Sequence, residues 1–212
     1  MRSRPACARR LQTRRRHKPA LLRRIARELL IVSGPYRQRL SEPIASQTLI
    51  VEMRGTPVLR WSGGAARCAI GRGGIGRKQR EGDGITPAGI FPIRKVLYRA
   101  DRVLRPQTGL PAEEISRDDG WCDAPGDPGY NRPVKLPYPA SAESMWREDR
   151  LYDVVAILGF NDDPVVDGAG SAIFLHCARD DFGPTEGCVA LKLPDLLNAL
   201  SGLDPGANIE IR

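Results

Sequence analysis

Two residues near the end of the chain have the side chains of a thiol acyltransferase or thiol peptidase. His176 ends the apolar run 171–176, and Cys188 begins the next apolar run. A thiol is mostly protonated at neutral pH, and a neighbouring imidazole that takes its proton leaves the nucleophilic thiolate. The only other histidine is His17, in a strongly basic segment, so His176 is the single credible base. If the two runs are neighbouring strands, their ends bring the imidazole and the thiol together.

Gly187 directly precedes Cys188 and allows a tight backbone turn. The N–H groups of Gly187 and Cys188 are the candidate donors for the oxyanion of a tetrahedral intermediate. Two other interpretations stay open, because a buried cysteine is often an inert small hydrophobe and a strand-end histidine is often structural. A zinc site of His176, Cys177 and Cys188 would lack a fourth ligand, and the chain has no Cys-x-x-Cys pair, so we expect no metal.

A second motif, the glycines of residues 71–76, has the G-x-G-x-x-G spacing of dinucleotide-binding sites. Such a site needs a helix directly after the glycines to receive the pyrophosphate. Residues 77–84 have no apolar helical stripe, and Pro87 follows soon after. We therefore interpret 71–89 as a glycine-rich connection between strands and expect no cofactor.

The elements that must position these residues are mostly strands. Eighteen prolines, 22 glycines and a 6% aromatic content indicate a turn-rich chain, and the only clear helical pattern is 194–200. We predict a mainly β fold with one or two short helices. Residues 101–150 are polar and irregular, and so long a stretch in a compact domain is typical of a binding loop. The predicted strands are 48–53, 57–61, 67–70, 89–98, 152–158, 171–176 and 207–211.

Charge divides the chain into two predicted parts, a basic leader at 1–45 and a catalytic domain at 46–212. Residues 1–40 hold 13 of the 33 Lys and Arg and a single acid, Glu28, which leaves 20 basic and 24 acidic residues beyond them. The net charge of +8 therefore belongs to the leader, and the mildly acidic remainder argues against a nucleic-acid partner. We expect the leader to be disordered or a short amphipathic helix, with weak membrane-surface contact as an alternative.

Membrane insertion and export are not indicated by the sequence. No run approaches the roughly 18–20 consecutive apolar residues of a membrane span. Charged residues interrupt the apolar positions of 21–30, so no export signal is legible.

Taken together, the motifs resemble the L,D-transpeptidase catalytic domain (YkuD-like) family. That family's signature is a histidine, a spacer and then Ser/Thr-x-Gly-Cys with an apolar residue, and the chain has His176 followed by Thr185-Glu186-Gly187-Cys188-Val189. The likeness covers about residues 47–212. Upstream, the segments that resemble the family's "G-x-G…K…D-G-x-T-P-x-G-x-F" pattern are Gly71-Arg72-Gly73-Gly74, Lys78, Glu81-Gly82-Asp83-Gly84 and Thr86-Pro87-Ala88-Gly89-Ile90-Phe91.

The resemblance implies a mixed β-sandwich that acts on peptidoglycan stem peptides without a cofactor. Cys188 would attack the carbonyl preceding a terminal D-amino acid, with His176 as base and then acid, and a thioester would form as D-alanine leaves. An amine of a second stem, or water, would then resolve the thioester. The resemblance also implies a periplasmic or cell-envelope location. A catalytically inactive peptidoglycan-binding module and an L,D-carboxypeptidase-type hydrolase remain alternatives.

Several positions depart from the common family pattern. The residue before Gly187 is Glu186 instead of histidine, the second residue after the cysteine is Ala190, and the residue after His176 is Cys177. The spacer is also short. These positions bear on how substrate is held. The chain has five cysteines, so at least one stays unpaired within it, and a Cys122–Cys177 bridge is left open. The residues expected to contact substrate are Arg179, Thr185, Glu186, Trp121, Tyr130 and Asn131, the last three from a long loop over the cysteine.

Overall fold

The computed structural model describes residues 47–212 and is mainly β, as the sequence predicts. The predicted leader at 1–45 lies outside the described residues. In the described part there are fourteen strands and one helix. They are β1 (Thr48–Arg54), β2 (Thr56–Trp61), β3 (Gly64–Arg67), β4 (Ile75–Gly76), β5 (Thr86–Pro87), β6 (Gly89–Tyr98), β7 (Ala112–Glu114), β8 (Asp119–Cys122), β9 (Pro133–Lys135), β10 (Ala142–Ser144), β11 (Val154–Leu158), β12 (Phe174–Cys177), β13 (Val189–Leu191), α1 (Leu193–Ser201) and β14 (Asn208–Ile211).

Nine strands form one sheet that almost closes on itself. Its order is β13-β12-β11-β6-β14-β1-β2-β3, and β7 pairs with β6. The chain leaving β3 then reaches β13, where the N–H of Ala69 donates to the carbonyl of Ala190 at 2.7 Å and the N–H of Ala190 donates back at 2.9 Å. The strand that follows Cys188 therefore has hydrogen-bonded neighbours on both sides.

Alternation along the strands produces two apolar clusters on opposite faces of this sheet. On β12, Leu175 and Cys177 belong to the larger cluster, whereas Phe174 belongs to the smaller one. Helix α1 packs onto the larger cluster through its buried residues Leu196, Ala199 and Leu200. Successive strand residues point to opposite faces, so this pattern determines which side chains reach the smaller cluster and the space beside it.

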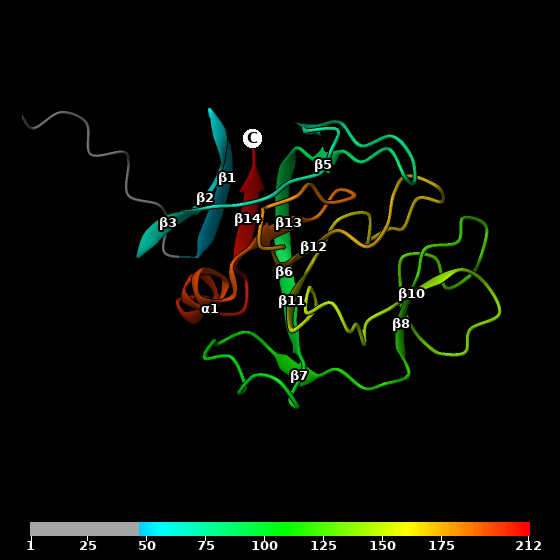
Figure 1. Cartoon of the computed structure of the whole chain (residues 1–212). Coiled ribbons are helices and arrows are strands. Elements are labelled where there is room, and N and C mark those ends of the chain that lie inside the picture. Colours follow the sequence, from blue (N-terminus) through cyan, green and yellow to red (C-terminus); the bar gives the residue numbers. More distant parts are fainter. Residues whose placement is uncertain (1–46) are drawn as a thin grey trace, which may run out of the picture. The chain divides into compact units, whose positions relative to one another are not determined.

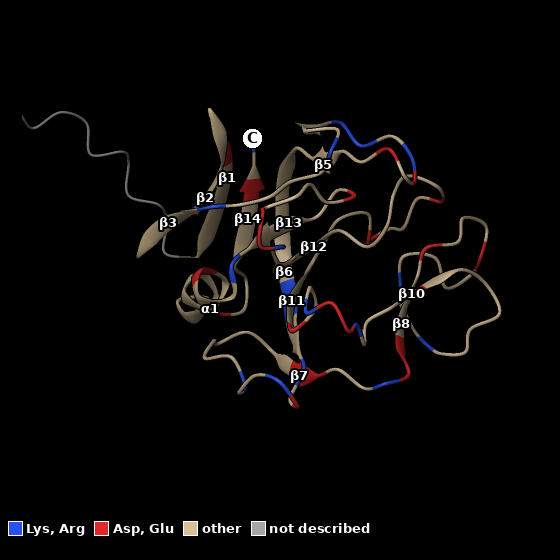
Figure 2. Ribbon diagram, viewed as in Figure 1, with Lys and Arg blue, Asp and Glu red and all other residues tan. Residues whose placement is uncertain are grey.

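The irregular stretch 101–150 contributes β7 and a separate three-stranded sheet of order β10-β8-β9. In Figure 1 the labels β8 and β10 lie on the opposite side of β6 and β11 from β1–β3. Figure 2 shows that Lys, Arg, Asp and Glu are interspersed and lie largely in the loops. No helix in the described part is long and apolar enough to cross a membrane.

Helix α1 and most predicted strands occur within a few residues of their predicted bounds. The third strand differs, because β3 ends at Arg67 and only an isolated bridge follows at Ala69. The glycine segment 71–76 ends in β4, which pairs with β5, and the residues that follow it form a loop. The helix N-terminus that a dinucleotide site requires therefore does not form there.

Candidate active site

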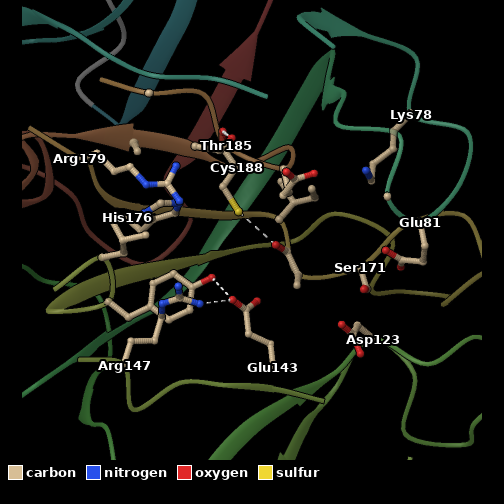
Figure 3. A pocket seen from close by; sticks show the side chains of 18 residues that line it. Lys78, Glu81, Asp123, Glu143, Arg147, Ser171, His176, Arg179, Thr185 and Cys188 are labelled. Carbon is tan, nitrogen blue, oxygen red and sulfur yellow. Dashed lines mark hydrogen bonds and ion pairs between the residues drawn. The ribbon is translucent and has the colours of Figure 1, made fainter. Parts of the chain in front are cut away.

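A cavity of about 460 Å³ opens over the ends of β12 and β13 (Figure 3). Both predicted catalytic side chains, Cys188 and His176, line it. Its walls come from the glycine-rich connection, from the irregular stretch, and from the segments that flank β12 and precede β13. The other lining residues are Lys78, Glu81, Gly82, Asp123, Glu143, Arg147, Leu151, Tyr152, Ser171, Ala172, Ile173, Arg179, Gly183, Thr185, Glu186 and Ala190.

Strand register places the imidazole and the thiol on the same face of the sheet. The strands β12 and β13 are parallel, with His176 opposite Ala190 and Leu175 opposite Val189. Cys188 precedes Ala190 by two residues, so it shares that face and lies diagonally from His176. Strand spacing puts two such Cα atoms about 8 Å apart, a separation that a cysteine and a histidine side chain can span.

The thiol of Cys188 is held by backbone groups and not by the imidazole. Its Sγ donates to the carbonyl of Ala172 at 3.2 Å and accepts from the N–H of Phe174 at 3.3 Å, and among the described residues no hydrogen bond joins it to His176. Burial raises the pKa of this thiol to about 12, although the Phe174 N–H acts in the opposite direction. The resting thiol is therefore protonated and needs a base.

His176 has the protonation state that such a base requires. Nδ1 lies 2.9 Å from the carbonyl oxygen of Cys177, and because a carbonyl only accepts, the neutral ring carries its proton on Nδ1. The lone pair is then on Nε2. Burial lowers the pKa of His176 to about 4, so the ring is neutral at pH 7. The edge of the ring packs against Tyr152, with centroids 5.3 Å apart.

The turn before Cys188 is fixed by Thr185. The hydroxyl of Thr185 accepts from the N–H of Gly187 at 3.2 Å and donates to the carbonyl of Cys188 at 2.6 Å. Gly187 has φ 138°, and a Cβ there would lie 2.9 Å from the carbonyl oxygen of Ile85, so glycine is required. The Gly187 N–H, predicted as an oxyanion donor, is thus engaged at rest, which leaves the Cys188 N–H as the stronger candidate. The Thr185 hydroxyl, predicted to contact substrate, is instead hydrogen-bonded within this turn.

Arg179 and Glu186, both predicted to contact substrate, lie at the exposed rim of the cavity. Arg179 donates from Nη1 to the carbonyl of Pro184 at 3.1 Å. Glu186 forms an ion pair with Arg72 in the glycine-rich connection. Glu186 does not accept a hydrogen bond from the His176 ring, whose Nδ1 proton goes to the Cys177 carbonyl.

The structure corrects the expectation that Trp121, Tyr130 and Asn131 cover the cysteine. All three are buried and none lines the cavity, because they tie neighbouring segments together instead. Asn131 Oδ1 accepts from Trp121 Nε1 at 3.0 Å and from the N–H of Ala172 at 3.1 Å. Tyr130 donates its hydroxyl proton to Glu81 and accepts from the N–H of Gly170 at 3.0 Å. Their contribution is to hold the segment whose carbonyl contacts Sγ.

The other cysteines in the part of the chain that the structure describes do not line this cavity. Cys68, Cys122 and Cys177 are buried free thiols, so the Cys122–Cys177 bridge is absent from the described part. Cys177 belongs to the apolar cluster on the face opposite Cys188, so the zinc site that the sequence left open, with His176, Cys177 and Cys188 as ligands, cannot assemble on one face. Burial raises the pKa of Cys177 to about 11, as expected for an inert core thiol.

Sequence reasoning missed several cavity residues from the irregular stretch. Glu143 accepts from Arg147 Nη1 at 3.0 Å and from the Tyr152 hydroxyl at 2.9 Å, and burial raises the pKa of Glu143. The only available signal was the length of the stretch, which pointed to a binding loop without naming residues. Lys78, noted only within a motif, has its buried Nζ 2.7 Å from Asp83 Oδ1 and lines the cavity beside Gly187.

A comparison with protein families matches residues 41–211 to YkuD, the L,D-transpeptidase catalytic domain. The chain belongs to this family. YkuD members are generally L,D-transpeptidases with a peptidoglycan-related function, and they are typically extracytoplasmic. The match spans the predicted catalytic residues and the whole sheet described above. A search of curated proteins found no match to the chain.

Proposed function

We propose that this YkuD domain catalyses cysteine-dependent acyl transfer on peptidoglycan stem peptides, with release of D-alanine, in the periplasm or cell envelope. One observation carries the proposal. A protonated thiol and a neutral imidazole with its lone pair on Nε2 line the same cavity, from one face of adjacent strands. These are the partners that nucleophilic thiol catalysis needs.

The reaction starts from the neutral pair. The Sγ–H turns from the Ala172 carbonyl toward His176, Nε2 takes the proton, and the sulfur attacks the carbonyl carbon that precedes the terminal D-alanine. The Cys188 N–H donates to the resulting oxyanion. The imidazolium then gives its proton to the departing amine, D-alanine leaves, and a thioester to Cys188 remains.

The second half-reaction uses the same groups in reverse. His176, neutral again, takes a proton from an incoming amine as that amine attacks the thioester carbonyl. The C–S bond breaks, and the sulfur recovers its proton from the imidazolium. Water in place of the amine gives hydrolysis. General acid–base catalysis of this kind contributes about 10²–10⁴-fold to the rate.

The test is covalent capture of the acyl-enzyme. The purified protein is incubated with a tetrapeptide stem, and mass spectrometry follows both the adduct on the protein and free D-alanine. We expect an adduct that disappears in Cys188→Ala and persists in Cys68→Ala, a matched variant in the opposite apolar cluster. A folded protein that gives neither adduct nor D-alanine contradicts the proposal and favours the inactive binding module.

Adding an amine acceptor separates the remaining outcomes. A cross-linked or exchanged peptide indicates transfer, whereas a shortened tripeptide alone indicates the L,D-carboxypeptidase-type hydrolase. His176→Gln should lower the rate of adduct formation by about 10²-fold or more, without loss of the folded state as judged by circular dichroism.

A further inference from the structure

The cavity has an acidic side that the proposed acyl-transfer steps do not use. Four of its lining residues, Glu81, Asp123, Glu143 and Ser171, form what we call the acidic subsite. Figure 3 shows Glu81, Asp123 and Ser171 on the opposite side of Cys188 from His176 and Arg179. The four come from separate segments: the β4–β5 loop, the loop directly after β8, strand β10 and the segment before β12.

Two polar atoms of the acidic subsite are buried without a hydrogen-bond partner in the described part of the chain. They are the hydroxyl oxygen of Ser171 and Oδ1 of Asp123. Ser171 is only 5% exposed, so its hydroxyl has little access to solvent. Buried polar groups nearly always have hydrogen-bond partners, so two unpartnered polar atoms in one cavity point to a ligand that supplies the missing hydrogen bonds.

The charges of the acidic subsite specify the kind of ligand. Glu143 is paired with Arg147, and the nearby Lys78 is paired with Asp83. In the described part of the chain, Asp123 has no ion-pair partner, and the one hydrogen bond to the Glu81 carboxylate comes from the neutral Tyr130 hydroxyl. The acidic subsite therefore holds uncompensated negative charge within a partly enclosed space, where the low dielectric strengthens attraction to a cation.

We infer that the acidic subsite binds a primary ammonium group of the peptide substrate. An ammonium carries one positive charge and three N–H donors, which matches the Asp123 and Ser171 oxygens together with a carboxylate of Glu81 or Glu143. This inference rests on the proposed function, because it places the ammonium on a stem peptide whose carbonyl reaches Cys188. The group belongs either to the acyl donor or to the incoming acceptor, and both present the same chemistry.

Binding of a small probe tests the inference without any reaction. The probe is Nα-acetyl-lysine methylamide, its neutral counterpart is the same compound acetylated on Nζ, and the readout is NMR titration of the ¹⁵N-labelled protein. We expect shifts around Ser171 and Asp123 with the charged probe alone, and about tenfold weaker binding in Asp123→Asn, in line with the loss of one charge-assisted hydrogen bond. Ser171→Ala is the second variant, and Glu148→Gln, an exposed acid outside the cavity, is the charge-matched control.

Two results overturn the inference: no binding of the charged probe by the wild-type protein, or equal binding by the wild type, Asp123→Asn and Ser171→Ala. Both binding measurements are independent of catalysis. A protein that binds the probe but forms no acyl-enzyme would therefore support the acidic subsite and contradict the proposed function. In an active enzyme, a KM that rises in Asp123→Asn during acylation without acceptor assigns the ammonium to the donor. A rise confined to aminolysis of the thioester assigns it to the acceptor.

Discussion

Replacing Asn131 by glycine tests whether this residue positions the catalytic segment or contacts substrate. Its carboxamide makes four hydrogen bonds, to Trp121 Nε1, the Ala172 N–H and the carbonyls of Phe160 and Asn161, at 2.7–3.1 Å. At about 1 kcal/mol each, their loss lowers the free energy of unfolding by about 4 kcal/mol. For a domain of this size that corresponds to a fall in Tm of roughly 8–16 °C.

Glycine is the informative substitution because Asn131 has φ 54°, in the left-handed region. Glycine adopts this conformation without strain, so Asn131→Gly removes the side-chain bonds alone, whereas Asn131→Ala should destabilise by about a further 1 kcal/mol. Asn198→Ala, on the exposed side of α1, is the control and should change stability by less than about 0.5 kcal/mol.

The kinetic consequence follows from the Ala172 carbonyl, which accepts from Cys188 Sγ. Releasing Ala172 misplaces the thiol, so we expect kcat for acylation to fall by roughly 10–100-fold while KM changes little. Thermal unfolding and stopped-flow measurement of D-alanine release give both quantities. A variant with unchanged Tm and a raised KM would refute this reasoning and restore Asn131 as a substrate contact.

Two further predictions concern His176, the proposed base, and Gly187, which precedes the proposed nucleophile. Burial lowers the pKa of His176 from 6.5 to about 4. Between these pH values the unfolded chain binds a proton that the folded chain does not. The free energy of unfolding should therefore fall by roughly 3 kcal/mol as the pH drops from 6.5 to 4. Urea unfolding measures this fall in the free energy of unfolding, which should be smaller by about that amount in His176→Gln than in the wild type. An equal fall in both proteins would contradict the prediction. Gly187→Ala forces a Cβ to 2.9 Å from the Ile85 carbonyl oxygen at φ 138°, which should destabilise by about 1–3 kcal/mol and abolish adduct formation; normal stability with full activity would argue against a constrained turn.

The fold was predictable where local patterns determine the structure. The apolar run of β1, the alternating pattern of β14 and the helical pattern of 194–200 each act over a few residues, and these elements occur close to their predicted bounds. The parallel pairing of β1 with β14 joins residues more than 150 positions apart, and no local pattern encodes it. The β-bridge between Ala69 and Ala190 also joins residues far apart in the sequence.

The site was predictable only in part, for a related reason. Cys188 and His176 stand out because their chemistry is rare in the chain and because they flank a short loop. Asn131 and Ser171 carry ordinary polar side chains, and their roles depend on which segment lies beside them after folding. Aromatic and amide residues in the long loop were therefore expected at the cavity, whereas Trp121 and Asn131 are inside the wall that supports it.

The hydrogen bonds between Ala69 and Ala190 limit how the sheet beside the cavity can adapt to bulky ligands. A strand at the margin of a sheet can separate to admit a ligand, but separation of the strand after Cys188 would break both its ladder to β12 and its bridge to Ala69. Adjustments that admit a bulky ligand, such as the peptidoglycan of the proposed function, must come from the surrounding loops. Divergence in specificity among related chains should accordingly concentrate in 101–150 and 178–186, while the floor of the cavity beneath Cys188 keeps its shape.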